Sequence, residues 1–317
     1  MLEKVNVGLI GAGSMANSVH YPSLAEFPDV NMVAICDLVE SKLNATADRF
    51  NITRRYIDYK EMIERERLDA VYILMPPHHL FDIVIYALKR GLHVFIEKPP
   101  AVTTFQAKSM ARIAAENGCI TMVGFNRRYI PMMTYGKRYV EERGKINQVV
   151  ATFYKKSSAV YYDGVVDVIG CDAIHAVDAL RWMAGSDAME VASLESQYDD
   201  VVPNSWNAIV RFENGVSGIL LTNWNVGTRI HTFEIHAPGV SAFLNPNDKG
   251  FIYEDGKVTV IDTKEIAGSG ENYKYYGFFA ESRHFIDCVK AGKEPSSSFA
   301  DAVKTMELVD MIRAKTI

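Results

Sequence analysis

The 317-residue chain is long for a single hydrophobic core, so we expect two domains. Its 48% hydrophobic and 23% charged content is that of an ordinary soluble globular protein. A net charge of −5 gives no reason to expect nucleic acid or an anionic membrane as a partner. No apolar run reaches the roughly 18 residues that a membrane span needs.

The cysteines are scattered along the chain without a Cys-x-x-Cys pair, at Cys36, Cys119, Cys171 and Cys288. This spacing argues against a metal site or a disulfide framework and suits a reducing compartment. The N-terminus lacks the charged, apolar and small-residue order of a signal peptide, because an apolar strand begins at Val5. We therefore expect a cytoplasmic protein without a metal site.

A glycine-rich turn near the N-terminus carries the strongest motif. The apolar strand Val5 to Ile10 leads into Gly11-x-Gly13-x-x-Ala16, and a helix is predicted from Ser14 to Phe27. Gly11 permits a tight turn, Gly13 lets backbone amides approach a pyrophosphate, and Ala16 keeps helix and strand close. The first turn of the helix offers N–H groups to the phosphates. The pattern predicts a bound dinucleotide.

Strands and helices alternate through the first 124 residues. Further strands are predicted over 31–36, 70–74, 93–96 and 120–123, and helices over 39–50, 79–90 and 103–117. Short strands separated by helices imply right-handed βαβ units and a parallel, doubly wound α/β sheet. We predict that residues 1–124 form an NAD(P)-binding domain.

The pattern changes beyond Gly144. Strands are predicted over 149–154, 208–212, 216–222, 232–236 and 258–261, and helices over 172–184, 277–291 and 298–314. These elements predict an α+β domain over 125–317 with a large, mostly antiparallel sheet, which we expect to bind substrate. The open face of such a sheet needs a cover, and a second subunit would supply one. We expect a homodimer or a homotetramer.

Asp37 ends the second predicted strand, somewhat over about 20 residues past the glycine turn. A carboxylate there accepts hydrogen bonds from the adenosine ribose hydroxyls and repels a 2′-phosphate, which favours NAD over NADP. NADP stays possible, because Ser41 and Lys42 lie nearby and suit a phosphate. A solvated aspartate at a strand end is the alternative.

Two segments hold residues suited to proton chemistry. Lys98, in Glu97-Lys98-Pro99-Pro100, follows a predicted strand at the edge where open α/β sheets bind ligands. On a helix from 172 to 184, Asp172, His175 and Asp178 lie at i, i+3 and i+6, within about 120° of one face.

Together these motifs resemble those of the Gfo/Idh/MocA family, the glucose–fructose oxidoreductase and inositol dehydrogenase-like enzymes. The resemblance spans nearly the whole chain and rests on Gly11-x-Gly13-x-Met15-Ala16, Pro76, Gly91-x-His93-Val94, Glu97-Lys98-Pro99, Gly124-Phe-Asn-Arg-Arg-Tyr129 and His175-x-x-Asp178. It implies an N-terminal Rossmann domain and a C-terminal α/β domain whose sheet often mediates oligomers. It also implies NAD(P)-dependent oxidation or reduction of a sugar, inositol or related polyol at a secondary carbon.

The resemblance assigns Lys98 as the catalytic lysine and His175 as the acid/base. Hydride leaves a carbinol carbon only as the hydroxyl proton is lost, so a base is needed, and histidine titrates near neutrality. A lysine ammonium stabilises the developing alkoxide. Many family members carry an aspartate where this chain has Cys171, and Asp172 stands one position later. Asp172 either reaches the site through a distorted first turn or caps the helix.

The predicted site residues fall into three sets. The cofactor set is Gly11, Gly13, Ser14, Met15, Ala16, Asp37, Pro76, His78, Glu97 and Lys98, the substrate set is Lys98, Arg127, Tyr129, Asp172 and His175, and the catalytic set is Lys98, His175 and Asp172. Tyr161, Tyr162 and Asp163 are weaker substrate candidates, and a ligand contact at His20 is left open.

Two other functions fit the same motifs. One is a trans-dihydrodiol dehydrogenase-like enzyme, or a ketone or imine reductase, that uses NADPH. The other is a non-catalytic dinucleotide-sensing regulator, which the shifted aspartate at Asp172 favours and the intact Lys98 and His175 oppose. The partner expected under the leading hypothesis is a small-molecule sugar or polyol.

Overall fold

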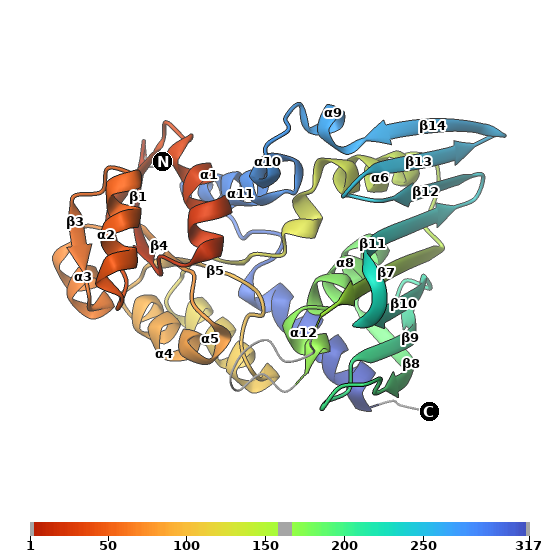
Figure 1. Ribbon diagram of the computed structural model, residues 1–317, viewed down its shortest axis with the longest axis horizontal. Coiled ribbons are helices and arrows are strands. Elements are labelled where there is room, and N and C mark those ends of the chain that lie inside the picture. The colour runs from red at the N-terminus through yellow and green to blue at the C-terminus, as the bar shows by residue number, and fades with distance from the viewer. Residues whose placement is uncertain (1–2, 158–166, 315–317) are drawn as a thin grey trace. The chain divides into compact units, whose positions relative to one another are not determined.

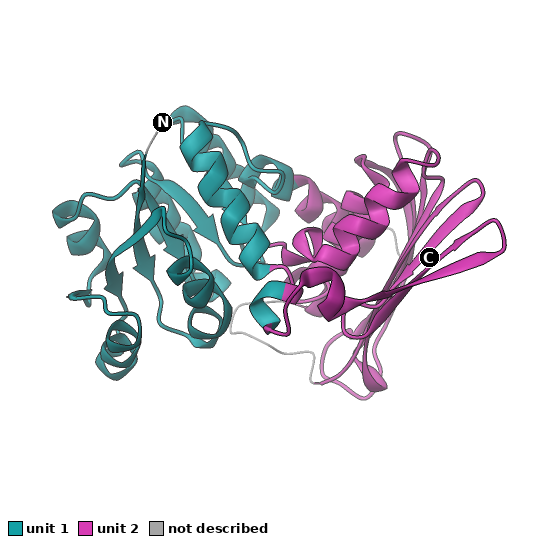
Figure 2. Cartoon of the chain, turned by 90° about the horizontal axis from the view of Figure 1, so that it is seen from above, with its two compact units in different colours: residues 1–124, 272–274, 278–303 teal, residues 125–271, 275–277, 304–317 magenta. Residues whose placement is uncertain are grey.

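A computed structural model describes residues 3–157 and 167–314 of the chain (Figure 1). The chain forms two compact units, coloured separately in Figure 2. The first unit comprises residues 1–124, 272–274 and 278–303, and the second comprises 125–271, 275–277 and 304–317. The C-terminal segments therefore contribute to both units.

The first unit contains a six-stranded parallel sheet in the order β3-β2-β1-β4-β5-β6. Its strands are β1 (Val5–Ile10), β2 (Val30–Cys36), β3 (Arg54–Tyr56), β4 (Ala70–Ile73), β5 (His93–Ile96) and β6 (Thr121–Val123). This order is that of a dinucleotide-binding Rossmann fold, so the predicted fold of this region is confirmed. The strand order reverses beside β1, which is where such sheets bind their ligands.

Helices cover this sheet, and one of them comes from the distant C-terminal region. They are α2 (Glu40–Arg49), α3 (Tyr59–Arg65), α4 (Pro77–Leu88), α5 (Thr104–Glu116) and α11 (Phe278–Ala291), besides the first helix. Residues of α11 contact the first helix and β1, whereas α4 packs against α5, β4 and β5.

The first helix is not the regular helix predicted over Ser14 to Phe27. A π-helical turn, η1 (Ala16–His20), precedes the short helix α1 (Tyr21–Ala25). The Tyr21 N–H donates to the Ala16 carbonyl, five residues back. Pro22 explains the irregularity, because it has no N–H with which to form the next α-helical bond.

The second unit contains an eight-stranded sheet in the order β14-β13-β12-β11-β7-β10-β9-β8. Only β7 and β10 pair in parallel among its described strands. The strands are β7 (Gln148–Lys156), β8 (Ala188–Ser196), β9 (Ser205–Phe212), β10 (Ser217–Asn223), β11 (Asn225–Ala237), β12 (Val240–Leu244), β13 (Lys249–Glu254) and β14 (Lys257–Asp262). The mostly antiparallel sheet is confirmed, although β8, β12 and β13 were not predicted.

Helices pack on one face of this sheet. They are η2 (Asn126–Tyr129), α6 (Pro131–Glu141), α7 (Val168–Cys171), α8 (Ile174–Ala184) and α9 (Thr263–Ala267), with α10 (Asn272–Tyr275) and α12 (Phe299–Ala314) completing the chain. Residues of α8 contact β7 and β10, and α6 contacts β11 and β12. Trp206 and Trp224 are buried in the core.

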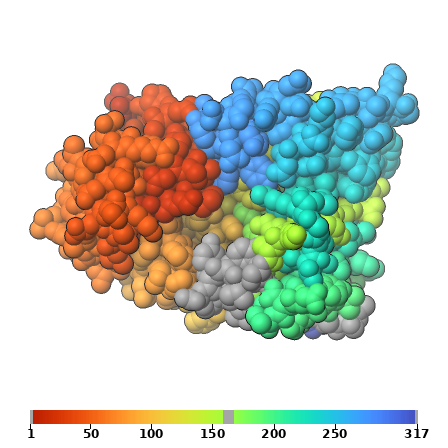
Figure 3. Space-filling view, viewed as in Figure 1, coloured from red at the N-terminus to blue at the C-terminus, as the bar shows by residue number. Residues whose placement is uncertain are grey.

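The opposite face of the eight-stranded sheet exposes large apolar side chains. Strands β12 to β14 reach the molecular surface in Figure 3. The exposed side chains include Leu194, Ile209, Phe243, Phe251, Tyr253, Val258 and Val260, of which Ile209 is 64% exposed. Such an apolar face is typical of an interaction surface. Within the described residues no helix is long and apolar enough to cross a membrane.

Candidate active site

The glycine turn after β1 has the conformation that the motif requires. Gly11 has a φ of +102°, and a Cβ at that position would lie 2.5 Å from the Leu74 carbonyl oxygen. Only glycine fits there. A Cβ on Gly13 would meet nothing within 4 Å, so its backbone faces open space. This open backbone can receive a pyrophosphate.

Asp37 follows β2 and braces this turn. One carboxylate oxygen accepts the Ala12 N–H at 2.7 Å, and the other accepts the Val39 N–H at 2.8 Å. Each carboxylate oxygen has a second lone pair, so the side chain can still accept from a ribose hydroxyl. The described contacts of Asp37 include no cation.

A pocket of about 490 Å³ opens at the carboxyl ends of β1, β2 and β4. Its lining is partly apolar and partly polar. The apolar residues include Ile10, Leu38, Ile57, Met75 and Ile83, and the polar ones include Asp37, Tyr59 and His78. This volume and mixed lining suit the adenosine of a dinucleotide. The residues present therefore fit NAD, for which Gly13 would receive the pyrophosphate and Asp37 the ribose.

The other predicted cofactor residues lie close to these two features. Ser14 and Met15 are exposed just after the turn, whereas Ala16 is 1% exposed and packs inward. Pro76 is the N-cap of α4, and His78 is exposed in the first turn of that helix.

Glu97 and Lys98 follow β5 at the same edge of the sheet. His20 Nε2 donates to Glu97 Oε1 at 2.7 Å, and the backbone N–H of Lys98 donates to Glu97 Oε2 at 3.0 Å. Burial raises the pKa of Glu97, but the hydrogen bond and charge of His20, together with Lys98, outweigh it and lower the pKa. The Glu97 carboxylate thus restrains the backbone that carries Lys98, which is half-buried.

His20 and Glu97 belong to a buried polar cluster that includes Glu281 of α11. One nitrogen of His20 and one oxygen of each carboxylate lie within 4.8 Å of one another. The His20 ring makes edge contacts with Phe95 and Phe278 at centroid distances of 5.3 and 5.7 Å. Sequence reasoning missed Glu281, because nothing near it in the chain indicates a partner 184 residues away.

His175 lies on α8 of the second unit, whose start differs from the prediction. The predicted helix over 172–184 is broken: α8 begins at Ile174, and Asp172 is the C-cap of α7 with φ −122°. The N-cap of α8 is Ala173, with no side-chain capping bond. Asp172 therefore does not cap α8, and its carboxylate forms an ion pair with Lys155. The first helical turn is therefore distorted, and the role of Asp172 in the site stays a prediction.

The hydrogen bond at His175 defines its protonation state. Arg127 Nη1 lies 3.0 Å from His175 Nε2. A guanidinium only donates, so Nε2 must present its lone pair and the ring is neutral. Arg127 also donates to Asn126 Oδ1 at 2.6 Å, and its guanidinium lies 5.7 Å and 5.1 Å from the rings of Phe153 and Tyr276. Both His175 and Arg127 are buried.

Tyr276 is held at this site by contacts within the second unit. Asn126 Nδ2 donates to the Tyr276 carbonyl at 2.8 Å. Gly277, with φ +89°, packs so closely on η2 that a Cβ would lie 2.5 Å from the Asn126 carbonyl oxygen. Tyr129, at the end of η2, is half-buried, and the candidates Tyr161, Tyr162 and Asp163 lie outside the described residues.

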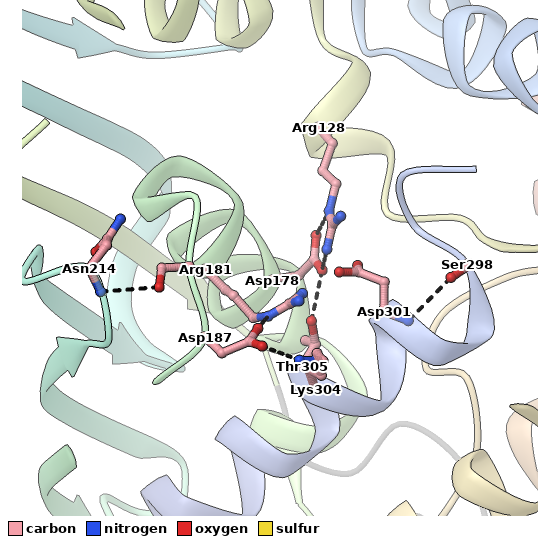
Figure 4. Close-up of polar contacts among 10 residues, drawn as sticks. Arg128, Asp178, Arg181, Asp187, Asn214, Ser298, Asp301, Lys304 and Thr305 are labelled. Carbon is pink, nitrogen blue, oxygen red and sulfur yellow. Dashed lines mark hydrogen bonds and ion pairs between the residues drawn. The ribbon is translucent and has the colours of Figure 1, made fainter. Parts of the chain in front are cut away.

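Asp178, one turn after His175, forms an ion pair with Arg128. Arg128 donates from Nε to Oδ2 at 2.8 Å and from Nη2 to Oδ1 at 2.5 Å, and Thr305 Oγ1 donates to Oδ1 at 3.0 Å (Figure 4). Both charged side chains are nearly inaccessible, at 4% and 1% exposed. This pair fixes α8 against η2 and thereby the positions of His175 and Arg127.

His231 of β11 completes the second-unit site. Its ring stacks on Phe153 at a centroid distance of 3.5 Å. Burial and the positive charges of Arg127, Arg229 and Lys155 lower the pKa of His231 to about 2, although Asp172 acts in the opposite direction. His231 is therefore neutral. His236, five residues later, lies on the other face of the sheet, as the strand parity predicts.

Comparison with known proteins agrees with this architecture. Residues 5–125 match the model of an oxidoreductase family with an NAD-binding Rossmann fold, GFO_IDH_MocA, and residues 137–239 match the GFO/IDH/MocA C-terminal domain. Together these matches cover most of the chain.

Relatives match over nearly their full lengths. The scyllo-inositol 2-dehydrogenase (NAD(+)) of Bacillus subtilis is 23% identical, over 97% of this chain and 93% of its own. The myo-inositol 2-dehydrogenase of Thermotoga maritima is 24% identical, over 94% and 92%. A levoglucosan dehydrogenase solved with NADH and levoglucosan has the same fold, with a TM-score of 0.84 over 98% and 97% and 24% identity.

The glycine turn with Asp37, the Lys98 position and the two matching domain models lead to one conclusion. The protein is an NAD-dependent oxidoreductase of the Gfo/Idh/MocA family.

Proposed function

We propose that the protein transfers hydride between NAD and a secondary hydroxyl or carbonyl of a sugar, inositol or related polyol. Residues 1–124 would form the cofactor-binding domain, and residues 125–317 the domain for substrate binding and oligomerisation. The relatives that act on inositol and levoglucosan support the substrate class. The NAD-binding family model disfavours the NADPH reductase alternative.

The neutral state of His175 is the observation that carries the proposal. Its Nε2 lone pair accepts from Arg127, so His175 can take the proton of a substrate hydroxyl when that hydroxyl displaces the Arg127 N–H. We assign Lys98 to stabilise the alkoxide charge that develops as that proton leaves. Bound NAD supplies the hydride acceptor, which no side chain can replace. Lys155 restrains Asp172, which we assign to orient the substrate.

Replacing Lys98 by methionine tests the assignment. The change keeps the length of the side chain and removes its charge, so we expect kcat to fall about 100- to 10,000-fold. Calorimetry of NAD binding shows how much of that loss comes from the cofactor contact that is also predicted for Lys98. Turnover is followed as NADH absorbance with a panel of inositols, sugars and polyols. Lys89→Met is the matched control, since Lys89 is an exposed lysine at the end of α4.

The outcomes separate the competing functions. Turnover that is equal in Lys98→Met and the unaltered protein would remove Lys98 from the mechanism. Binding of NAD without turnover of any compound in the panel would favour the dinucleotide sensor instead. His175→Asn should lower kcat as well, because the proton acceptor is lost.

We also propose that a second copy of the chain covers the apolar face of the eight-stranded sheet. The exposed side chains of β9 and β12 to β14 form the kind of surface that monomers rarely leave open. Sedimentation velocity distinguishes one, two and four copies. A cytoplasmic location stays a prediction, which the four free cysteines suit.

A further inference from the structure

Arg127 uses only part of its hydrogen-bonding capacity. Nη1 donates to Asn126 and to His175, whereas Nε and Nη2 have no acceptor among the residues that the structure describes. The fully buried polar atoms that lack a hydrogen-bond partner do not include Nε or Nη2 of Arg127. Both atoms are therefore accessible to a ligand. The Nε–Nη2 edge of a guanidinium matches the two oxygens of a carboxylate or phosphate.

The other buried arginines of the second unit differ from Arg127. Arg128 has Asp178, and Arg181 has Asp187 at 2.8 Å. Arg127 is only 6% exposed, yet no carboxylate of the described chain lies within ion-pair distance of it. Burying a cation without an anion is costly, and proteins pair such charges. A partner for Arg127 is therefore expected from outside the described chain.

A second arginine, the solvent-exposed Arg229, lies beside the same aromatic ring. Arg229 donates to the Tyr276 hydroxyl at 3.0 Å, and its guanidinium lies 5.9 Å from that ring, compared with 5.1 Å for Arg127. The described contacts of Arg229 likewise include no carboxylate, only Tyr276 and His231. Two cations thus flank Tyr276 without a counterion in the described part of the chain.

The electrostatic balance around these arginines is positive. Arg127, Arg229 and Lys155 all act on His231, and Asp172 is the one carboxylate among the groups that do so. Lys155 and Asp172 pair with each other, which leaves the two arginine charges in excess. His175 and His231 add no negative charge. A neutral polyol would leave the buried charge of Arg127 unbalanced.

We propose that the substrate carries an anionic group, a carboxylate or a phosphate, which binds the Nε–Nη2 edge of Arg127 with Arg229 as the second cation. The inference rests on the proposed function and narrows its substrate class to sugar acids, hydroxy acids or sugar phosphates. The hydroxyl that reacts would then lie only a few bonds from the anionic group.

Paired substrates test this inference. Steady-state kinetics with NAD compare D-glucose with D-glucuronate, D-gluconate and D-glucose 6-phosphate, and myo-inositol with its monophosphate. We expect kcat/KM to be about 10- to 100-fold higher for at least one anionic member than for its neutral counterpart, as charge-assisted bonds to two guanidiniums require. Whether acids or phosphates lead the series identifies the anionic group.

Variants locate the effect. Arg229→Gln and Arg127→Gln should each lower the anionic-to-neutral ratio of kcat/KM by about tenfold or more. Arg211→Gln is the control, because Arg211 lies on β9 with a 64% exposed side chain and should leave the ratio unchanged. Binding of D-gluconate to the NADH complex, measured by calorimetry, gives a readout that does not need turnover.

The two proposals fail in different ways. Neutral sugars that turn over better than every anionic partner would overturn this inference and leave the proposed function standing. Binding of D-gluconate that depends on Arg127 and Arg229, without turnover of any compound, would support the anion site and contradict the dehydrogenase. An anionic-to-neutral ratio that both variants leave unchanged would also overturn the inference.

Discussion

Arg127 and Arg128 are neighbours in the chain, and both are buried in the second unit, but their surroundings are opposite. Arg128 meets the carboxylate of Asp178 with two hydrogen bonds, and Thr305 also donates to that carboxylate. Arg127 meets a neutral histidine and an amide. A buried charge that the chain itself neutralises is explained by folding, whereas one left unbalanced points to a ligand.

The first unit shows the same contrast with carboxylates. Glu97 is buried and is matched by His20. Asp37 accepts two backbone N–H groups, and its described contacts include no cation. Glu97 therefore resembles Arg128 in being satisfied within the fold, and Asp37 is the negative counterpart of Arg127. In each unit, therefore, one charged group near the predicted site has its partner within the fold and another lacks an opposite charge in the described chain.

The largest expected effect on stability comes from removing the carboxylate that pairs with Arg128, which leaves that arginine without a counterion, as Arg127 is within the described chain. Asp178→Asn keeps the shape of the side chain and leaves the Arg128 guanidinium buried without its carboxylate. We expect the free energy of unfolding to fall by about 3–5 kcal/mol, as for other buried pairs that lose one partner. Urea denaturation followed by circular dichroism measures the change.

Asp187→Asn is the control for that experiment. Asp187 also binds two cations, Arg181 and Lys304, but its side chain is 29% exposed (Figure 4). Water reaches Asp187 and the 49% exposed Lys304, although Arg181 is buried, so we expect a smaller loss of about 1 kcal/mol. Equal losses at Asp178 and Asp187 would show that burial does not separate the two pairs.

The sequence predicted the elements whose pattern is local. Buried apolar runs such as Val5–Ile10 and His93–Ile96 have the same bounds in the structure as in the prediction. The short strand β3 (Arg54–Tyr56) escaped because two of its three residues are exposed arginines rather than an apolar run. The positions of Asp37 and Lys98 after strands followed from the strands themselves.

Contacts between distant segments could not be predicted. The pairing of Arg128 with Asp178 joins positions 50 residues apart, and the His20–Glu97 bond joins positions 77 apart. The break before α8 stayed open between two alternatives, because the i, i+3 spacing of Asp172 and His175 also suits a regular helix. No local pattern distinguishes Arg127 from Arg128, and only the fold decides which arginine meets a carboxylate.

A partly exposed carboxylate of the first unit, Asp29, should show a smaller effect on stability, and one that depends on pH. Asp29 accepts from Arg283 at 2.7 Å and from Lys290 at 2.6 Å, both on α11, and its side chain is 23% exposed. The hydrogen bond from Arg283 lowers the pKa of Asp29 from 3.8 to about 2, and Lys290 acts in the same direction. Burial acts in the opposite direction and is outweighed. We expect Asp29→Asn to lose about 2 kcal/mol of stability at pH 7.

The sign of the pH dependence follows from that lowered pKa. The folded protein keeps Asp29 ionised where the unfolded chain has begun to protonate it, so the stabilisation is complete above about pH 4. It decreases as the pH falls toward about 2, where the folded group also takes up a proton. Urea denaturation of both proteins between pH 7 and pH 3 should show their difference shrinking. A difference that stays constant would assign the effect to something other than the charge of Asp29.

The smallest expected effect is that of replacing Asp37, the carboxylate of the first unit whose described contacts include no cation. If Asp37 accepts from the ribose hydroxyls, Asp37→Asn should raise the KM for NAD about five- to tenfold, close to 1 kcal/mol, and reduce the preference for NAD over NADP. Asp48→Asn is the control, because Asp48 is a 69% exposed aspartate on α2 that pairs with Arg55. An unchanged cofactor preference would mean that Asp37 only braces the glycine turn through Ala12 and Val39. In that case a charge without a counterion would indicate a ligand site only where the charged group is also buried, as Arg127 is.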